Sequence, residues 1–318
     1  MDKPSFAFFG STKFSKDLLL FLIEKKFKPA AIFSIPENFK ISYSNKKVKN
    51  FNYYNLKIIA DKFKIPYYEV RSTKEKKTKY LKILKELNLD IMLFLGWYYM
   101  VPEFIRGLSK YGAWGIHASL LPKYAGGAPL VWALINGEKK TGVTIFRMKS
   151  GVDDGDIILQ KLININFNDN INDLYKKVAK ISKKILLVCL NNYKKLKFTK
   201  QDKKKIKIYP QRTPKDGRIN WLFEAIDIYN FVRAQTKPYP CAFSKIKNTN
   251  LKIKVISCKI IRKNNVNNNY GEIIKFDKKI LVVTRKNFIQ LLKIEFNQKE
   301  YSFKNFAKKK NLVGKKFI

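Results

Sequence analysis

Short, unbroken apolar runs alternate with helical patterns through the first hundred residues, and this alternation limits the fold more than any other feature of the chain. A strand buried on both faces is a continuous apolar run, and helices between such strands cover the two faces of a parallel sheet. We therefore expect strands at residues 5–9, 30–35, 65–70 and 91–95, with helices at 14–26, 54–64 and 73–87.

The loops that follow three of the apolar runs are expected to lie side by side. Ligands of open α/β sheets bind beyond the carboxyl ends of the strands. Gly10–Thr12 and Gly96–Tyr98 each follow such a run, and His117 ends another apolar segment. The pattern predicts one functional rim made of these three loops. A basic polar loop is expected at residues 36–50.

A different pattern begins after residue 160. Residues 167–192 have the spacing of one or two amphipathic helices, and 193–208 are rich in Lys and poor in apolar residues, as a linker is. A further helix is expected at 222–235 and a surface loop in the Asn-rich tract 263–269. Short alternating runs separated by turn signals favour a small barrel, with strands at 251–258, 271–275, 280–284 and 288–294.

Composition excludes several classes of protein. Hydrophobic residues make up 46% of the 318, which is enough to bury a core and rules out general disorder. The longest strongly apolar run, Ile91–Val101, is shorter than the roughly 20 residues that span a bilayer. No signal peptide is recognised, and three cysteines without a CxxC pair suggest neither a disulfide framework nor a zinc site. A cytoplasmic protein with no membrane partner and no metal is expected.

The charge is strongly positive, but it does not identify a partner. Lys and Arg number 66 against 24 acidic residues, a formal net charge of +42. Such a field attracts nucleic acid, anionic membranes and phosphorylated substrates. Nearly all of the excess is Lys, accompanied by abundant Asn, Ile, Phe and Tyr, which is also the residue usage expected of an AT-rich genome. Both interpretations stay open.

The only histidine of the chain, His117, is the leading candidate for proton transfer. It lies between an apolar run and the loop Lys123–Pro129, and an Asp-rich turn, Gly151–Asp156, follows further on. Imidazole moves protons near neutral pH, and a carboxylate such as Asp153 or Asp156 would orient the ring. The alternatives are a satisfied structural histidine and an ordinary Asp turn.

The combined pattern resembles the folate-dependent formyltransferase family. That family has Asn-x-His and Ser-Leu-Leu-Pro, then a Gly-containing loop, Thr-Gly-Val-Thr and a Gly-x-Asp-x-Gly-Asp turn, and residues 117–156 match it without a gap. The resemblance implies an α/β fold: a Rossmann-like parallel-sheet catalytic domain at residues 1–192, a basic linker at 193–208 and a small OB-like β-barrel domain at 209–318. It further implies an enzyme of one-carbon metabolism that transfers a formyl group from 10-formyltetrahydrofolate to a primary amine.

The resemblance also assigns the catalytic residues, with one departure. His117 matches the family's catalytic histidine and Asp153 its catalytic aspartate, whereas the family's Asn falls on Gly115. That carboxamide is thought to hold the oxygen of the tetrahedral intermediate, and removing one such donor typically costs about 2.7–4 kcal/mol. Trp114, Tyr98 or Tyr99 would be replacement donors. We favour an active enzyme with a rearranged oxyanion site over a slow or degenerate one.

Folate and acceptor contacts follow from the same matches. The folate pocket is expected to be lined by Gly96, Trp97, Tyr98, Ser119, Leu120, Leu121, Pro122 and Asp156. The acceptor is expected at Gly10, Ser11, Arg212 and Arg233, where an arginine would bind phosphate or form an inter-domain salt bridge.

Two amine acceptors compete. The runs 123–132, 212–221 and 238–243 resemble the aminoarabinose-pathway enzyme, so an amino-sugar nucleotide is favoured and amino-sugar biosynthesis is the expected role. Initiator methionyl-tRNA is the alternative, because the lysines of residues 36–50 (Lys40, Lys46, Lys47 and Lys49) lie where the tRNA enzyme inserts a loop into the acceptor stem. A weakly active, nucleic-acid-binding relative is a further alternative.

Overall fold

The structure is a computed structural model that describes residues 3–41, 44–50, 52–71, 77–263 and 268–318. The chain divides into two compact units. The first unit comprises Met1–Gly126, Gly142–Ile163 and Lys177–Ile208, and the second comprises Gly127–Thr141, Asn164–Lys176 and Tyr209–Ile318.

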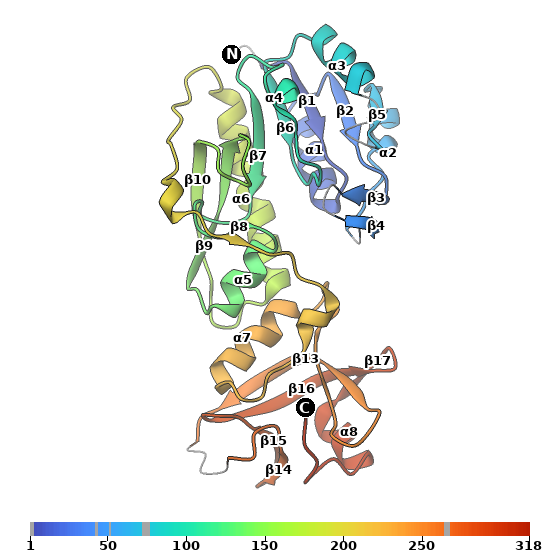
Figure 1. Ribbon diagram of the computed structural model, residues 1–318, viewed down its shortest axis with the longest axis vertical. Helices are drawn as coiled ribbons and strands as arrows, with labels where there is room; N and C mark the ends of the chain where they lie inside the picture. Colours follow the sequence, from blue (N-terminus) through green and yellow to red (C-terminus); the bar gives the residue numbers. More distant parts are fainter. Residues whose placement is uncertain (1–2, 42–43, 51, 72–76, 264–267) are drawn as a thin grey trace. The chain divides into compact units, whose positions relative to one another are not determined.

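A seven-stranded sheet, in the order β10-β9-β7-β6-β1-β2-β5, forms the core of the first unit (Figure 1). Neighbouring strands from β7 to β5 are parallel, whereas β9 is antiparallel to β7. The strands are β1 (Phe6–Phe9), β2 (Ala31–Ser34), β5 (Tyr67–Glu69), β6 (Ile91–Phe94), β7 (Ala113–His117), β9 (Lys140–Arg147) and β10 (Ile157–Asn164). The four strands expected in the first hundred residues are confirmed. Every residue of β1, β2 and β6 is buried, which explains the unbroken apolar runs in the sequence.

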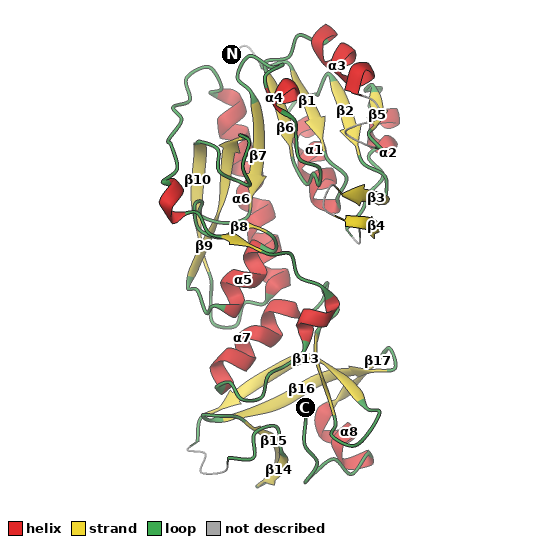
Figure 2. Ribbon diagram, in the orientation of Figure 1, coloured by secondary structure: helices red, strands yellow, loops and turns green. Residues whose placement is uncertain are grey.

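Five helices connect or flank these strands: α1 (Lys13–Glu24), α2 (Lys57–Lys62), α3 (Lys77–Glu86), α4 (Glu103–Arg106) and α6 (Ile171–Asn191) (Figure 2). A capping box begins α1, because the side chains of Thr12 and Ser15 each accept from the other's backbone N–H. α2 is shorter than the expected 54–64, and the expected beginning of the next helix, at 73–76, lies outside the described residues. Of the segment 167–192, where one or two helices are expected, residues 171–191 form the one helix α6.

The basic segment 36–50 contradicts the expectation of a loop. It contains a hairpin of β3 (Asn38–Ile41) and β4 (Ser44–Lys49). The physical reason is the apolar anchor Phe39, which is buried and contacts the rings of Tyr98 and Tyr99. Residues 42–43 and the side chains of Lys40, Lys46 and Lys47 lie outside what the structure describes, and Lys49 forms an exposed ion pair with Glu37.

An antiparallel sheet forms the second unit, as the fold class predicts. Its order is β12-β13-β16-β15-β14, with β17 paired to β16. The strands are β12 (Ala242–Lys245), β13 (Lys252–Ile261), β14 (Ile273–Phe276), β15 (Lys279–Val283), β16 (Phe288–Phe296) and β17 (Lys299–Ser302). The sequence patterns identified β13 to β16 but missed β12 and β17. Four residues of the Asn-rich tract, 264–267, lie outside the described residues.

Helices α5 (Pro129–Ile135), α7 (Ala225–Gln235) and α8 (Phe303–Lys309) complete the second unit. α5 and α7 pack together, and α7 also packs on β13. The hydrophobic core contains Ile228 and Val232 of α7 with Phe303 and Phe306 of α8. α7 begins three residues later than expected. The remaining short elements are β8 (Ala125–Gly126), β11 (Ile208–Tyr209) and the 3₁₀ turns η1 (Lys203–Lys205) and η2 (Pro214–Gly217).

Candidate active site

His117 ends β7 in a polar environment that defines the state of its ring. The side chain is 10% exposed. Its Nε2 lies 2.7 Å from the backbone oxygen of Tyr124, and its Nδ1 lies 3.4 Å from Oδ2 of Asp153. A carbonyl oxygen only accepts hydrogen bonds, so Nε2 carries the proton in the neutral ring. Nδ1 is therefore the ring nitrogen without a proton in that form, and it is the one that faces the Asp153 carboxylate.

Asp153, not Asp156, is the carboxylate that faces the histidine. Oδ2 of Asp153 also accepts from the backbone N–H of Gly126 at 2.8 Å, and the residue itself has a left-handed backbone with φ of 52°. Asp156 instead accepts from Nζ of Lys149 at 2.7 Å. Asp153 and Asp156 thus have different partners, and Asp153, which the sequence match pairs with His117, is the one that lies beside the ring.

The Ser119–Pro122 turn is held by a small polar network. Oγ of Ser119 donates to the oxygen of Lys123 at 2.6 Å, and Oγ1 of Thr144 donates to the oxygen of Ser119 at 2.7 Å. Gln160 donates to the oxygen of Leu121 at 3.0 Å and to Thr144. These bonds fix the turn directly after His117, although they do not test its predicted contact with folate.

Gly115 stands in a row of aromatic residues that crosses the sheet. Each residue of this row pairs with the next one on the neighbouring strand, in the order Tyr68, Phe33, Phe9, Phe94, Gly115 and Phe146 across the sheet. A Cβ on Gly115 would lie 2.9 Å from the ring of Phe146, which is closer than real Cβ atoms approach. The space that a Cβ of residue 115 would need is therefore taken by the Phe146 ring.

The three replacement donors that the sequence suggests already have hydrogen-bond acceptors. The indole N–H of Trp114 donates to the oxygen of Tyr111 at 2.9 Å. The hydroxyl groups of Tyr98 and Tyr99 donate to Oδ1 of Asn50 and to the oxygen of Arg71. Burial raises the pKa of Tyr99 to about 12, so its hydroxyl stays neutral.

The first two loops of the predicted rim meet at Asn50. Its Nδ2 donates to the oxygen of Ser11 at 3.1 Å, while its Oδ1 accepts from Tyr98 at 3.2 Å. Gly10 and Gly96 both lie against the side chain of Ser15, so neither has room for a Cβ. The structure thus brings together the predicted acceptor residues Gly10 and Ser11 and the predicted folate residues Gly96 and Tyr98.

Trp97 belongs to an apolar wall next to this rim. Its ring packs edge-on against Phe9 and Phe94. These three residues also line a small cavity of about 40 Å³ whose other walls are apolar or aromatic: Phe33, Val70, Tyr80, Leu84, Met100, Val101, Pro102 and Ile105. At this volume the cavity does not itself hold a pterin ring, because ligand pockets usually measure about 300–1,000 Å³.

Arg212 and Arg233 lie in the second unit, in different environments. The guanidinium of Arg212 lies over Trp132 and donates to Oε1 of Gln235 at 3.1 Å. Its Nε is buried without a partner among the described residues, and burial lowers the pKa of this side chain. Arg233 is 9% exposed and donates to the backbone oxygens of residues 166, 167 and 169. The bonds of Arg233 fix the segment before α6.

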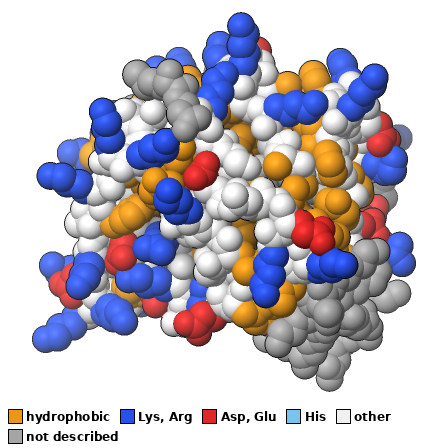
Figure 3. Space-filling model, turned by 90° about the horizontal axis from the view of Figure 1, so that it is seen from above, with side chains coloured by type: hydrophobic (Ala, Val, Ile, Leu, Met, Phe, Trp, Pro, Cys, Tyr) orange, Lys and Arg blue, Asp and Glu red, His pale blue; other side chains and the backbone are white. Residues whose placement is uncertain are grey.

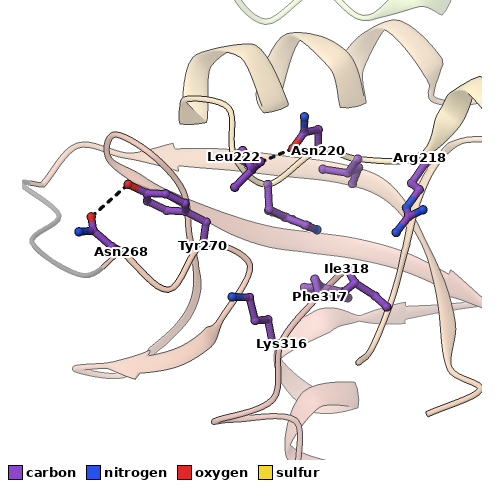
Figure 4. A pocket seen from close by; sticks show the side chains of 10 residues that line it. Arg218, Asn220, Leu222, Asn268, Tyr270, Lys316, Phe317 and Ile318 are labelled. Atoms are coloured by element: carbon purple, nitrogen blue, oxygen red, sulfur yellow. Dashed lines mark hydrogen bonds between the residues drawn. The ribbon is translucent and has the colours of Figure 1, made fainter. Parts of the chain in front are cut away.

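A larger cavity in the second unit contains none of the site residues that the sequence predicts. It measures about 480 Å³ and is bounded by Arg218, Asn220, Leu222, Tyr270 and Lys316, among others (Figure 4). The hydroxyl group of Tyr270 donates to Asn268 at 3.0 Å along one edge.

Sequence reasoning missed several residues that shape the site. Tyr124 acts through its backbone oxygen, which no side-chain pattern identifies. Asn50 and Gln160 are single polar residues in ordinary surroundings. Gln201 lies in the lysine-rich segment interpreted as a linker, yet it is buried and bonded to the Asp153 turn. The one signal in the sequence is that Gln201 is an uncharged polar residue within a run that is otherwise rich in lysine.

The described residues contain no group of three or more His, Cys, Asp or Glu arranged to hold a metal ion. Within the same part of the chain, no helix combines the length and hydrophobicity needed to cross a membrane. The three cysteines are buried and free, and burial raises the pKa of Cys189 and Cys258 to about 12.

Comparison with known proteins defines the class to which this fold and site belong. A family model described as formyl transferase matches residues 6–190, and one described as formyl transferase, C-terminal domain, matches residues 211–311. The chain belongs to the formyl transferase family, whose members are enzymes that transfer formyl groups.

Two relatives of known sequence carry different names. The methionyl-tRNA formyltransferase of Thermodesulfovibrio yellowstonii is 33% identical over 289 residues, covering 91% of this chain and 90% of that protein. The bifunctional polymyxin resistance protein ArnA of Wigglesworthia glossinidia brevipalpis is 40% identical over 185 residues, which is 58% of this chain and 28% of that protein.

Solved structures show the same fold. The N-formyltransferase from Helicobacter canadensis, in complex with folinic acid and dTDP-3-aminofucose, has a TM-score of 0.65 at 21% identity and covers 90% of this chain and 98% of that chain. The methionyl-tRNA formyltransferase from Clostridium thermocellum has a TM-score of 0.55 at 18% identity and covers 90% and 99%.

Proposed function

We propose that this enzyme transfers the formyl group of 10-formyltetrahydrofolate to a primary amine, with His117 as the proton acceptor. The observation that carries the proposal is the pair of ring contacts: Nε2 of His117 bonded to the oxygen of Tyr124, and Nδ1 facing Asp153. The amine attacks the formyl carbon as free base, and Nδ1 takes up the proton that the nitrogen loses. The C–N10 bond then breaks, and the proton passes to N10 of the departing tetrahydrofolate.

The proposed folate contacts are the two rim segments and the turn after His117. Gly96, Trp97 and Tyr98 supply an apolar wall, and Ser119, Leu120, Leu121 and Pro122 supply a turn whose backbone is fixed by the Thr144 network. Asp156 lies at the end of the Asp153 turn. An apolar wall with a few fixed polar groups is the usual form of a site for a flat heterocycle. Family members that have been crystallised with folate derivatives support this choice.

We propose an amino-sugar nucleotide as the acceptor. The support comes from the sequence resemblance of residues 123–132 and 212–221 to the aminoarabinose-pathway enzyme and from the 40% identity to the ArnA protein over 185 residues. Gly10, Ser11 and Arg212 are the proposed acceptor contacts. Arg212 would bind phosphate through its guanidinium group. Arg233 is committed to backbone oxygens, so we propose no direct phosphate contact for it.

Initiator methionyl-tRNA is the second candidate acceptor. The observation in its favour is a sequence match to a methionyl-tRNA formyltransferase that covers about nine tenths of both chains. The basic hairpin of β3 and β4 would supply phosphate contacts in that case.

A formyl-transfer assay with both acceptor classes tests these proposals. Purified enzyme receives 10-formyltetrahydrofolate with either a nucleotide-linked amino sugar or initiator methionyl-tRNA, and formation of tetrahydrofolate and of the formylated amine is measured. We expect turnover with the amino sugar and a loss of at least about 10²-fold in His117→Ala. Turnover with methionyl-tRNA alone would reverse the choice of acceptor. No turnover with either acceptor, together with nucleic-acid binding, would favour a weakly active, nucleic-acid-binding relative.

A further inference from the structure

Gln201 connects the lysine-rich segment after α6 to the turn that carries Asp153. The residue is 9% exposed. Its Nε2 donates to the backbone oxygen of Asp153 at 2.8 Å and to that of Gly155 at 2.6 Å, which uses both amide hydrogens. Two backbone bonds between Thr199 and Ile157 anchor the chain two residues before it. Gln201 is therefore a fixed donor, not a mobile surface side chain.

The backbone that Gln201 holds is one that an aspartate rarely adopts. Asp153 has φ of 52°, in the left-handed region that non-glycine residues seldom occupy. Such a conformation persists only when surrounding contacts impose it. The side chain of Asp153 is held by the backbone N–H of Gly126, and its carbonyl is held by Gln201. The residue is thus fixed at both ends, which sets the 3.4 Å approach of its carboxylate to His117.

We propose that Gln201 is a positioning residue for catalysis, which acts through Asp153 on His117; the inference rests on the proposed formyl transfer. Without the two bonds from Gln201, the turn relaxes toward negative φ and the carboxylate leaves Nδ1. A misplacement of about 1 Å in a catalytic group commonly costs on the order of 10²-fold in rate.

Gln201→Met is the main test, because methionine preserves the length of the side chain and removes both donors. Gln201→Glu, of nearly the same volume, carries the test if the first variant does not fold. The matched control is Gln290→Met, the same chemical change on β16 of the second unit. We expect kcat to fall by about 10- to 100-fold in the Gln201 variants, with KM for folate and amine within about twofold. The control should retain wild-type kcat.

A double-mutant cycle separates positioning from a general loss of structure. If Gln201 acts through Asp153, Gln201→Met should lower kcat no further in an Asp153→Ala background. A multiplicative loss in the double variant would show that Gln201 acts independently of Asp153 and would overturn the proposal.

The ring of His117 gives a readout that does not require turnover. It is the only histidine in the chain, so protein labelled with ¹⁵N-histidine gives the signals of one ring. Gln201→Met should shift these signals in the same direction as Asp153→Ala, while Gln290→Met leaves them unchanged. Shifted signals in a protein without formyl transfer would reject the proposed function and retain the positioning role. Unchanged signals with full kcat in Gln201→Met would reject the positioning role alone.

Discussion

Acidic residues of one turn can have different surroundings, as Asp153 and Asp156 of the 151–156 turn show. Asp153 faces His117, whereas Asp156 is paired with Lys149. We expect Asp153→Asn to lower kcat by roughly 10²- to 10⁴-fold, as neutralising the orienting carboxylate of a histidine does elsewhere. Asp156→Asn should raise KM for the folate and leave kcat nearly unchanged. Steady-state kinetics of both variants would settle the roles, and the reverse pattern would assign catalysis to Asp156.

Gly115 offers a prediction whose sign is unusual. Replacing a strand glycine with alanine normally stabilises a protein by about 0.5–1 kcal/mol. Here the new Cβ would meet the Phe146 ring at 2.9 Å, so Gly115→Ala should instead lower the free energy of unfolding by about 1–3 kcal/mol.

Phe146→Leu should remove this overlap, because leucine lacks the ring atoms that the new Cβ would meet. The double variant Gly115→Ala/Phe146→Leu should be more stable than the sum of its two single changes. Urea titrations of the four proteins measure the coupling. A stabilising Gly115→Ala would mean that the ring does not occupy this space.

The segment that follows β6 packs closely against the beginning of α1 at Gly96. Gly96 has φ of 76° and lies against Thr12 and Ser15 of the α1 capping box. Gly96→Ala should cost about 1–3 kcal/mol of stability, since both the conformation and the space disfavour a side chain. Gly107→Ala is the control, because Gly107 has φ of −84° and its nearest contact is an ordinary 3.7 Å. Equal melting temperatures for the two variants would contradict the argument.

The buried parallel strands were predictable because complete burial leaves a continuous apolar run, as in β1, β2 and β6. The β3–β4 hairpin was not, because its Lys-rich sequence hides the buried apolar residue Phe39. The strands β12 and β17 show no apolar pattern, because β12 buries a small Ala242 and a polar Ser244 and β17 is exposed throughout. The local sequence pattern thus identifies strands that are buried along their whole length, and it misses strands whose residues form no apolar run or alternation.

The candidate site was predictable only in part. His117 and Asp153 follow from a side-chain motif. Tyr124 contacts His117 through a backbone oxygen, and Gln201 bonds to the backbone of a turn more than forty residues before it, neither of which a side-chain motif records. The division at residues 193–208 stays a prediction, although Gln201 within it contacts the Asp153 turn.

The whole molecule has far more cations than anions. With 66 basic and 24 acidic residues, at least 42 cations have no acidic partner even if every carboxylate pairs once. On the face in Figure 3, Lys and Arg side chains are spread across the surface rather than gathered in one patch. Self-repulsion of this kind weakens as the Debye length falls to about 10 Å at 0.1 M salt. We expect the melting temperature to rise from low salt to about 0.2 M sodium chloride, as calorimetry would measure. A falling value would show that attractive ion pairs dominate.

Salt also distinguishes the two acceptors. A tRNA acceptor engages many phosphates at once, and its affinity falls with a log–log slope of about −0.7 to −0.9 per contact, or by roughly 10³-fold or more between 50 and 200 mM for six or more contacts. A nucleotide sugar presents only its own phosphates, so a local cation such as Arg212 suffices. On the proposed function, KM for the amino-sugar nucleotide should change by less than about tenfold across that range. The measurement is KM at constant enzyme and folate over a salt series, with an uncharged osmolyte as the control for viscosity and water activity. A steep salt dependence with methionyl-tRNA, and no saturable turnover with any amino-sugar nucleotide, would assign the positive charge to tRNA binding.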